Sequence, residues 1–211
     1  MGLTYMTGYL ILGMTYAFAA AVQPGPLQAY LISQTLTIGW RRALPAAFAP
    51  LISDGPIILL VLVVLSQMPG WFVRLLQCAG GIFLLILAFG AMKTWRNYYS
   101  SPPLNIQTGK QTFIKAVMVN LLNPAPYLGW SLVMGPLLLK GWRETPMNGI
   151  SLLIGFYITL ILVTLGIMLL FTAARPLGPR VNRALIGVSA IALTLFGLYE
   201  LFQGIGSSLS G

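Results

Sequence analysis

Three clusters of polar and helix-breaking residues interrupt long apolar stretches of the chain, and they are its strongest candidates for chemistry. The clusters are Gln23-Pro24-Gly25-Pro26, Ser53-Asp54-Gly55-Pro56, and Asn120 followed by Asn123-Pro124-Ala125-Pro126. A proline inside a helix lacks an N–H and clashes with the carbonyl four residues earlier, so it leaves backbone groups unpaired. Free carbonyl oxygens attract cations, and the N–H groups at the start of a new half-helix attract anions.

The two Pro-x-Pro motifs predict specific backbone consequences. They should free the carbonyls of Ala20, Val22, Asn120 and Leu122. We expect new half-helices to begin around Leu27-Gln28 and around Tyr127-Leu128. Unpaired backbone carbonyl and N–H groups cannot face lipid, so they must be buried in protein or line a hydrated cavity.

The composition around these motifs is that of an all-α integral membrane protein. The 211 residues are 57% apolar and 7% charged, with a mean hydropathy of +0.85. Soluble domains are typically about 45–50% apolar and about 25% charged. A helix needs roughly 20 apolar residues to cross the hydrocarbon core. Six stretches qualify, at residues 9–32, 44–66, 71–92, 113–139, 149–174 and 184–205.

The spacing of the motifs predicts an internal duplication. Pro24 and Pro124 lie 100 residues apart, close to half the chain. We expect a single membrane domain over residues 1–211, with one three-helix half at 1–95, a cytoplasmic linker at 96–112 and a second half at 113–211. Because three is an odd number of spans, the two halves must insert in opposite directions, which is the inverted-repeat plan of secondary transporters.

The basic residues predict the orientation. Nine of the twelve fall in or beside the connections after the first, third and fifth spans: Arg41, Arg42, Lys93, Arg96, Lys110, Lys115, Arg175, Arg180 and Arg183. The positive-inside bias places these residues in the cytoplasm and both termini outside. We therefore expect a multi-pass protein of the plasma (inner) membrane. The net charge of +9 is explained by this bias, and we expect no nucleic-acid partner.

Cysteine and histidine usage excludes several kinds of chemistry. Cys78 is the only cysteine and histidine is absent, which excludes disulfide frameworks, thiolate metal clusters and imidazole proton relays. With three acidic residues in the chain, neither a hydrolytic triad nor a carboxylate dyad can be assembled. We expect no enzymatic activity, no bound metal and no cofactor.

Asp54 is the most informative single residue. A carboxylate in the middle of a membrane costs roughly 2.5–3.5 kcal/mol on insertion scales, so it normally faces a cavity or a partner. We expect Asp54 to exchange protons or to bind a substrate ammonium. The structural alternative is a protonated Asp54 that caps a half-helix at Gly55-Pro56. Of the other acids, Glu144 is expected in solvent and Glu200 at the outer membrane interface.

These motifs resemble those of the LysE-type amino-acid exporters, a group that includes lysine, threonine and homoserine efflux proteins. Pro24-Gly25-Pro26 is similar to the first-span signature of that family. Asn123-Pro124 is similar to its Asn-Pro-Lys signature, with Ala125 in place of the lysine. The family's ladder of small residues ending in Gly-Asp, with three glycines replaced, is matched by Gly39, Ala43, Ala49, Ser53 and Asp54. The resemblance implies amino-acid transport in the outward direction.

The predicted function is a secondary transporter that exports small neutral or cationic amino acids by proton antiport with alternating access. The expected substrate-binding residues are Gln23, Pro24, Gly25, Pro26, Asp54, Asn120, Asn123, Pro124 and Pro126, with proton coupling at Asp54. The expected partners are an amino acid, protons and the lipid bilayer, and a homo-oligomer is compatible with the sequence. The alternatives are a passive channel, a hard-cation exporter, and a structural or assembly membrane protein.

Overall fold

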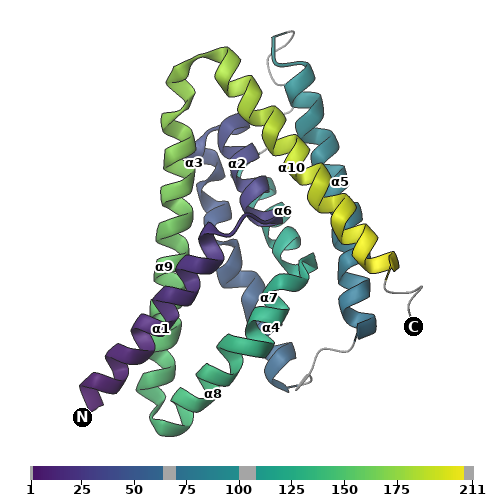
Figure 1. The fold of residues 1–211 in the computed structure, drawn as a ribbon. Coiled ribbons are helices and arrows are strands. Elements are labelled where there is room, and N and C mark those ends of the chain that lie inside the picture. The colour runs from purple at the N-terminus through teal and green to yellow at the C-terminus, as the bar shows by residue number, and fades with distance from the viewer. Residues whose placement is uncertain (1, 64–69, 100–107, 207–211) are drawn as a thin grey trace.

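The computed structural model describes residues 2–63, 70–99 and 108–206, and every regular element in these ranges is helical (Figure 1). The α-helices are α1 (Gly2–Val22), α2 (Pro26–Ile38), α3 (Trp40–Ala43), α4 (Ala49–Val63), α5 (Gly70–Arg96), α6 (Gly109–Leu122), α7 (Pro124–Gly129), α8 (Gly135–Glu144), α9 (Pro146–Ala173) and α10 (Pro179–Gly206). Two short 3-10 helices, η1 (Leu44–Phe48) and η3 (Arg175–Leu177), and a π-helical turn, η2 (Trp130–Met134), join them. The all-helical prediction is confirmed.

Four continuous helical segments within the described residues are long and apolar enough to cross a membrane. They are Trp40–Leu62, Gly70–Arg96, Pro146–Ala173 and Pro179–Ile205. Helices α1 and α2 qualify together as a pair bent by 64°, either one broken span or a re-entrant loop, which raises the number to five. These segments correspond to the second, third, fifth, sixth and first predicted spans.

The fourth predicted span, 113–139, is divided among several shorter helices. Helix α6 ends at Leu122 and α7 begins at Pro124, so this stretch contains no long uninterrupted helix. A π-helical turn then separates α7 from α8. The second half of the protein is thus interrupted at its Pro-x-Pro motif, as the first half is.

Both half-helices begin earlier than predicted. Helix α2 starts at Pro26, and α7 starts at Pro124. The prediction placed these starts further along because it treated the prolines as lying outside the new helix. A proline is tolerated in the first helical turn, since an N–H at that position would have no partner within the helix.

The cluster around Asp54 does not break its helix, although Pro56 is a helix-breaking residue. Helix α4 continues from Ala49 to Val63 with Pro56 inside it. A single proline removes one hydrogen bond from a helix, which can bend it without ending it. Asp54 therefore does not cap a half-helix at Gly55-Pro56, and the structural alternative for this residue is wrong.

Close helix pairs form the frame of the molecule. Helix α1 packs along α9, and α5 packs along α10, as Figure 1 shows. Glycines allow these approaches: a Cβ on Gly155 would collide with the backbone of Leu10, and one on Gly81 would lie 2.8 Å from the carbonyl oxygen of Gly197. Between the two pairs lie α2, α4, α6 and α7, the elements that carry the polar motifs.

The connections gather at two opposite ends of the molecule. The connection from α9 to α10 and the end of α5 lie at the upper end of Figure 1, where Lys93, Arg96, Arg180 and Arg183 are found. The start of α1 and the connection from α8 to α9 lie at the lower end. About half of the predicted linker at 96–112 (residues 100–107) lies outside the described residues, and α6 begins within its last part, with a capping box at Thr108.

Candidate functional site: a cavity between the broken helices

The two proline motifs and Asp54 meet at a single cavity of about 260 Å³. Its walls come from α1, α2, α4, α6, α7, α9 and α10, together with both interrupted segments. The predicted site residues that line it are Gln23, Pro24, Gly25, Pro26, Asp54, Asn120, Asn123 and Pro126. Pro124 is the exception, because it is buried in the first turn of α7 and does not line the cavity. Ala125, which replaces the family lysine, does line it.

Asp54 is held by a set of neutral hydrogen-bond donors. Its side chain is 3% exposed. Asn120 donates from Nδ2 to Oδ1 of Asp54 at 2.9 Å and to Oγ of Ser53 at 2.7 Å. The Tyr157 hydroxyl donates to Oδ2 at 3.4 Å, and the Trp130 side chain is a further hydrogen-bond partner. The carboxylate thus faces the cavity and polar groups of three other elements.

The small residues before Asp54 make this arrangement possible. Ala43, Ala49 and Ser53 are fully buried. The hydroxyl of Ser53 donates to the carbonyl of Ala49 at 3.0 Å, which leaves its oxygen to accept from Asn120. Small side chains let helices approach closely, so α4 and α6 can join their polar residues beneath the cavity.

The carbonyls freed by the proline motifs are partly satisfied by protein donors, a correction to the expectation that they are free. The side-chain amide of Gln28 donates to the carbonyls of Ala20 and Ala21, each at 3.4 Å. The backbone N–H of Asn123 donates to the carbonyl of Asn120 at 3.3 Å. Each carbonyl oxygen carries two lone pairs, so one of them stays available for a ligand.

The starts of α2 and α7 differ in how they are capped. Helix α2 follows Gly25, which has no side chain to accept a hydrogen bond from the first turn. At α7, Oδ1 of Asn123 accepts from the backbone N–H of Ala125 at 3.0 Å. Uncapped N–H groups at a helix start attract anions. The α2 start therefore offers an anion-binding edge of the cavity that the shorter α7 does not.

Several cavity residues were not predicted from the sequence. Tyr16 and Gln28 line the cavity, and Trp130 both lines it and contacts Asp54. Tyr157 also reaches Asp54. The sequence holds no signal that separates these aromatic side chains from ordinary packing residues.

Glu200 is a correction to the sequence analysis, which placed it at the outer interface. Its side chain is 8% exposed, and it lines the cavity from α10. Depth along a span was the only criterion available for that prediction, and depth does not tell whether a residue faces lipid, water or the interior. An acidic residue inside the apolar 184–205 stretch was the signal that could have indicated a site residue.

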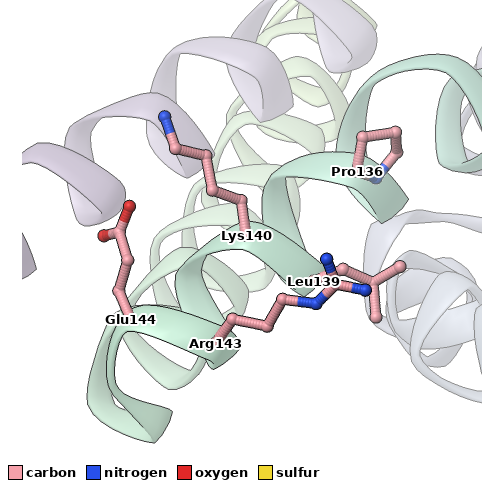
Figure 2. Close-up of a pocket in the computed structure, with 5 residues that line it drawn as sticks. All are labelled: Pro136, Leu139, Lys140, Arg143 and Glu144. Carbon is pink, nitrogen blue, oxygen red and sulfur yellow. The ribbon is translucent and has the colours of Figure 1, made fainter.

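A second hollow lies along α8 and has a different character. Pro136, Leu139, Lys140, Arg143 and Glu144 line it, and Figure 2 shows Lys140 and Glu144 extending to one side of the helix and Arg143 to the other. Glu144 is exposed, as expected, and accepts a hydrogen bond from Nδ2 of Asn148 at 3.1 Å. These basic side chains lie outside the central cavity, whose described lining contains two acids and no lysine or arginine.

Interrupted apolar helices around a buried polar cavity define a helical membrane protein of the translocator class. The chain belongs to the LysE type translocator family, whose model matches residues 18–204. It is 27% identical over 206 residues to "Putative amino acid efflux protein YcgF" of Bacillus subtilis (strain 168), an alignment that covers 93% of this chain and 95% of that protein. No solved structure matches the chain significantly. The resemblance derived from the motifs is confirmed, and the family is one of translocators, not of enzymes.

Proposed function

We propose that this protein is a secondary transporter that exports small amino acids from the cytoplasm across the plasma membrane, by proton antiport with alternating access at the central cavity. The observation that carries the proposal is the meeting of both proline motifs with Asp54 around one cavity of about 260 Å³. Drug-sized ligands occupy pockets of about 300–1,000 Å³, so a slightly smaller cavity suits an amino acid. The name of the Bacillus relative agrees with this substrate class.

The cavity offers complementary partners for the two charges of an amino acid. Asp54 supplies a carboxylate for the ammonium group, with the Asn120 amide beside it. The uncapped start of α2, after Gly25, supplies N–H groups for the substrate carboxylate. The other predicted residues, except Pro124, line the same cavity. Because the described residues of the cavity lining include no lysine or arginine, neutral and cationic amino acids fit it better than acidic ones.

Asp54 is the proposed site of proton coupling. Its described partners are neutral side chains, so it has no permanent counter-charge and can be neutralised by a proton or by a substrate ammonium. The two would then compete for one carboxylate, which is the requirement for antiport. One charge moving across 100 mV supplies about 2.3 kcal/mol. That energy sustains a gradient of roughly 50-fold, at about 1.36 kcal/mol per tenfold.

The proposed architecture is six spans in two inverted three-helix halves. Exchange of the halves would pair the first span with the fourth, the second with the fifth and the third with the sixth. In such a repeat, α1 of the first span corresponds to α6 of the fourth, and α9 of the fifth span corresponds to α4 of the second. The packing of α1 on α9 should then be matched by packing of α6 on α4, which is also present. Helices α5 and α10, the third and sixth spans, correspond to each other in the repeat, and they pack together. This pattern of neighbours supports the repeat, with α6 to α8 acting as a broken fourth span.

The proposed orientation has both termini outside. The end of α5 and the start of α10 share one end of the molecule and carry Lys93, Arg96, Arg180 and Arg183. The positive-inside bias favours that end as the cytoplasmic one. The opposite end, where α1 starts, would then face outward.

Counterflow in proteoliposomes tests this function. The purified protein is reconstituted into proteoliposomes, which are loaded with one amino acid of a panel and given a pH gradient. The flux through the parent protein is compared with that through Asp54→Asn. We expect saturable exchange and proton-driven export by the parent, and a folded variant that has lost the proton-driven component. Glu144→Gln removes the same charge outside the cavity and is the matched control. Unchanged proton-driven flux in Asp54→Asn would remove Asp54 from the mechanism, and non-saturating flux in the parent would favour a channel.

A further inference from the structure

A groove between the end of α5 and the start of α10 has no role in the transport function proposed above. Its volume is about 380 Å³, and among the described residues it shares none of its lining with the central cavity. It lies towards the upper end of Figure 1, between two helices that pack together. One part of its wall carries the apolar side chains of Met92, Val188 and Ile191, and the other part carries Trp95, Arg180 and Arg183.

Arg183 is held in place at the basic end of this groove. Its Nε atom donates to the backbone carbonyl oxygen of Trp95 at 3.3 Å. Its guanidinium carbon lies 5.1 Å from the centre of the Trp95 ring and 5.2 Å from the centre of the Tyr99 ring. A Cβ on Gly187 would lie 2.8 Å from Nε1 of Trp95, so this glycine lets the indole lie against α10. The N–H groups on the two Nη atoms of the guanidinium can then donate to a ligand from a fixed position.

The acidic residues of the chain all lie away from these arginines. The whole sequence has three of them. Asp54 and Glu200 line the central cavity, and Glu144 ends α8 near the opposite end of the molecule. In the described part of the chain, the lining of the groove thus has two arginines and no acid. This charge favours an anionic ligand that comes from outside the chain.

The shape of the groove suits a ligand with a charged head and a long apolar chain. From Arg180 to Ile191 the groove follows α10 for about 16 Å, at about 1.5 Å per residue. That length is close to half of the roughly 30 Å hydrocarbon core, which is the depth of one leaflet. Val188 and Ile191 are 63% and 53% exposed, so an acyl chain can reach them. A further hollow beside the connection from α9 to α10 shares Tyr99, Arg180 and Arg183 with the groove and offers room for a headgroup.

We propose that this groove binds one anionic phospholipid, with its phosphate at Arg180 and Arg183 and an acyl chain along Val188 and Ile191. Arginine forms paired hydrogen bonds with phosphate, and basic hollows between membrane helices at the cytoplasmic side suit such headgroups. A free phosphate would leave the apolar part of the groove unused. Because the lipid would contact both α5 and α10, its binding should stabilise the folded protein. The site lies outside the transport cavity, so the inference does not depend on the substrate.

A titration with two lipids that differ in headgroup charge tests this site. Dioleoyl phosphatidylglycerol and dioleoyl phosphatidylcholine carry the same acyl chains, and each is added to the full chain in detergent. Native mass spectrometry counts the bound lipid and gives its affinity. We expect the parent to bind one phosphatidylglycerol about tenfold more tightly than phosphatidylcholine, the factor expected of a hydrogen bond between charged groups. Arg183→Gln should remove this preference, and Arg183→Lys, which keeps the charge without the planar guanidinium, should keep part of it.

Two controls separate a lipid site from simpler attraction. Lys93→Gln removes one positive charge from the same end of α5, at an exposed residue outside the lining of the groove, and should keep the preference of the parent. Inorganic phosphate supplies the anion without the acyl chains. We expect phosphatidylglycerol to raise the melting temperature of the parent and inorganic phosphate at the same concentration to leave it unchanged.

Several results would overturn the inference. Equal affinity of the parent for the two lipids would show that the headgroup charge is not recognised. An equal loss in Arg183→Gln and Lys93→Gln would show attraction to the net charge of this end of the protein, and equal stabilisation by inorganic phosphate would show that the apolar part takes no part in binding. If Arg183→Gln fails to fold, Arg180→Gln, at an exposed position, decides, and an unchanged lipid preference in that variant overturns the inference. Amino-acid export stands or falls separately, in the counterflow experiment.

Discussion

The side-chain amide of Asn120 donates to Oδ1 of Asp54 at 2.9 Å and to Oγ of Ser53 at 2.7 Å, and so joins the two halves of the chain at the floor of the cavity. Asn120 lies in the last turn of α6, just before the break at Asn123, and Asp54 lies in the middle of α4. A movement of α6 relative to α4 would therefore disturb this contact.

Replacing Asn120 by alanine should weaken substrate binding by at least about tenfold. A hydrogen bond to a charged group is worth about 1.5–3 kcal/mol, and 1.4 kcal/mol corresponds to a factor of ten. Tyr157→Phe removes the longer 3.4 Å contact to the same carboxylate and should have a smaller effect. The measurement is the concentration dependence of amino-acid exchange in proteoliposomes. A larger loss in Tyr157→Phe than in Asn120→Ala would contradict this order.

Gly155→Ala should destabilise the protein by about 1–3 kcal/mol through overpacking. A Cβ at this position would collide with the backbone of Leu10 and force α1 away from α9. Gly166→Ala, on the same helix, is the matched control because a Cβ there meets nothing within 4 Å. That substitution should be neutral or stabilising by about 0.4–1 kcal/mol. Thermal unfolding in detergent compares the two, and equal melting temperatures would show that α1 and α9 do not pack this closely.

Gly39→Ala should cost about 1–3 kcal/mol because of its backbone conformation. Gly39 joins α2 to α3 with φ 91° and ψ 152°, a region that residues with a Cβ rarely adopt. Gly90→Ala, inside α5 with open space around it, is the control. We expect a lower melting temperature for Gly39→Ala alone. A melting temperature equal to that of the parent would argue against this sharp turn.

Thr108→Ala should destabilise the start of α6 by about 0.5–2 kcal/mol. The Thr108 hydroxyl accepts from the backbone N–H of Gln111 at 3.3 Å, and the Gln111 side chain accepts from the backbone N–H of Thr108 at 3.1 Å. Thr94→Ala removes a hydroxyl that bonds only to the carbonyl of Gly90 in its own helix, and it should have little effect. Hydrogen exchange of the first turn of α6 reads out the change. Unaltered exchange in Thr108→Ala would indicate that the reciprocal cap contributes nothing.

The elements that the sequence predicted well are those governed by local chemistry. Long apolar runs became α5, α9 and α10, because a chain in lipid must satisfy its own backbone hydrogen bonds. The breaks at the two Pro-x-Pro motifs were predicted for a related reason, since a proline cannot donate to the preceding turn. Pro56 shows the limit of that reasoning, because α4 continues through it.

The residue types, their spacing and the family were determined by the sequence alone: the proline motifs, the acid at Asp54 and the apolar composition were enough to predict a helical LysE-type translocator. Only the tertiary structure decided which side chains share the cavity. Glu200, Trp130 and Tyr157 lie far from Asp54 along the chain, and the packing of α9 and α10 against the broken helices brings them to one site. The physical reason is that the direction a side chain faces depends on how a helix is rotated against its neighbours, and close contacts between helices distant in sequence, such as those of Gly155 and Gly81, set that rotation.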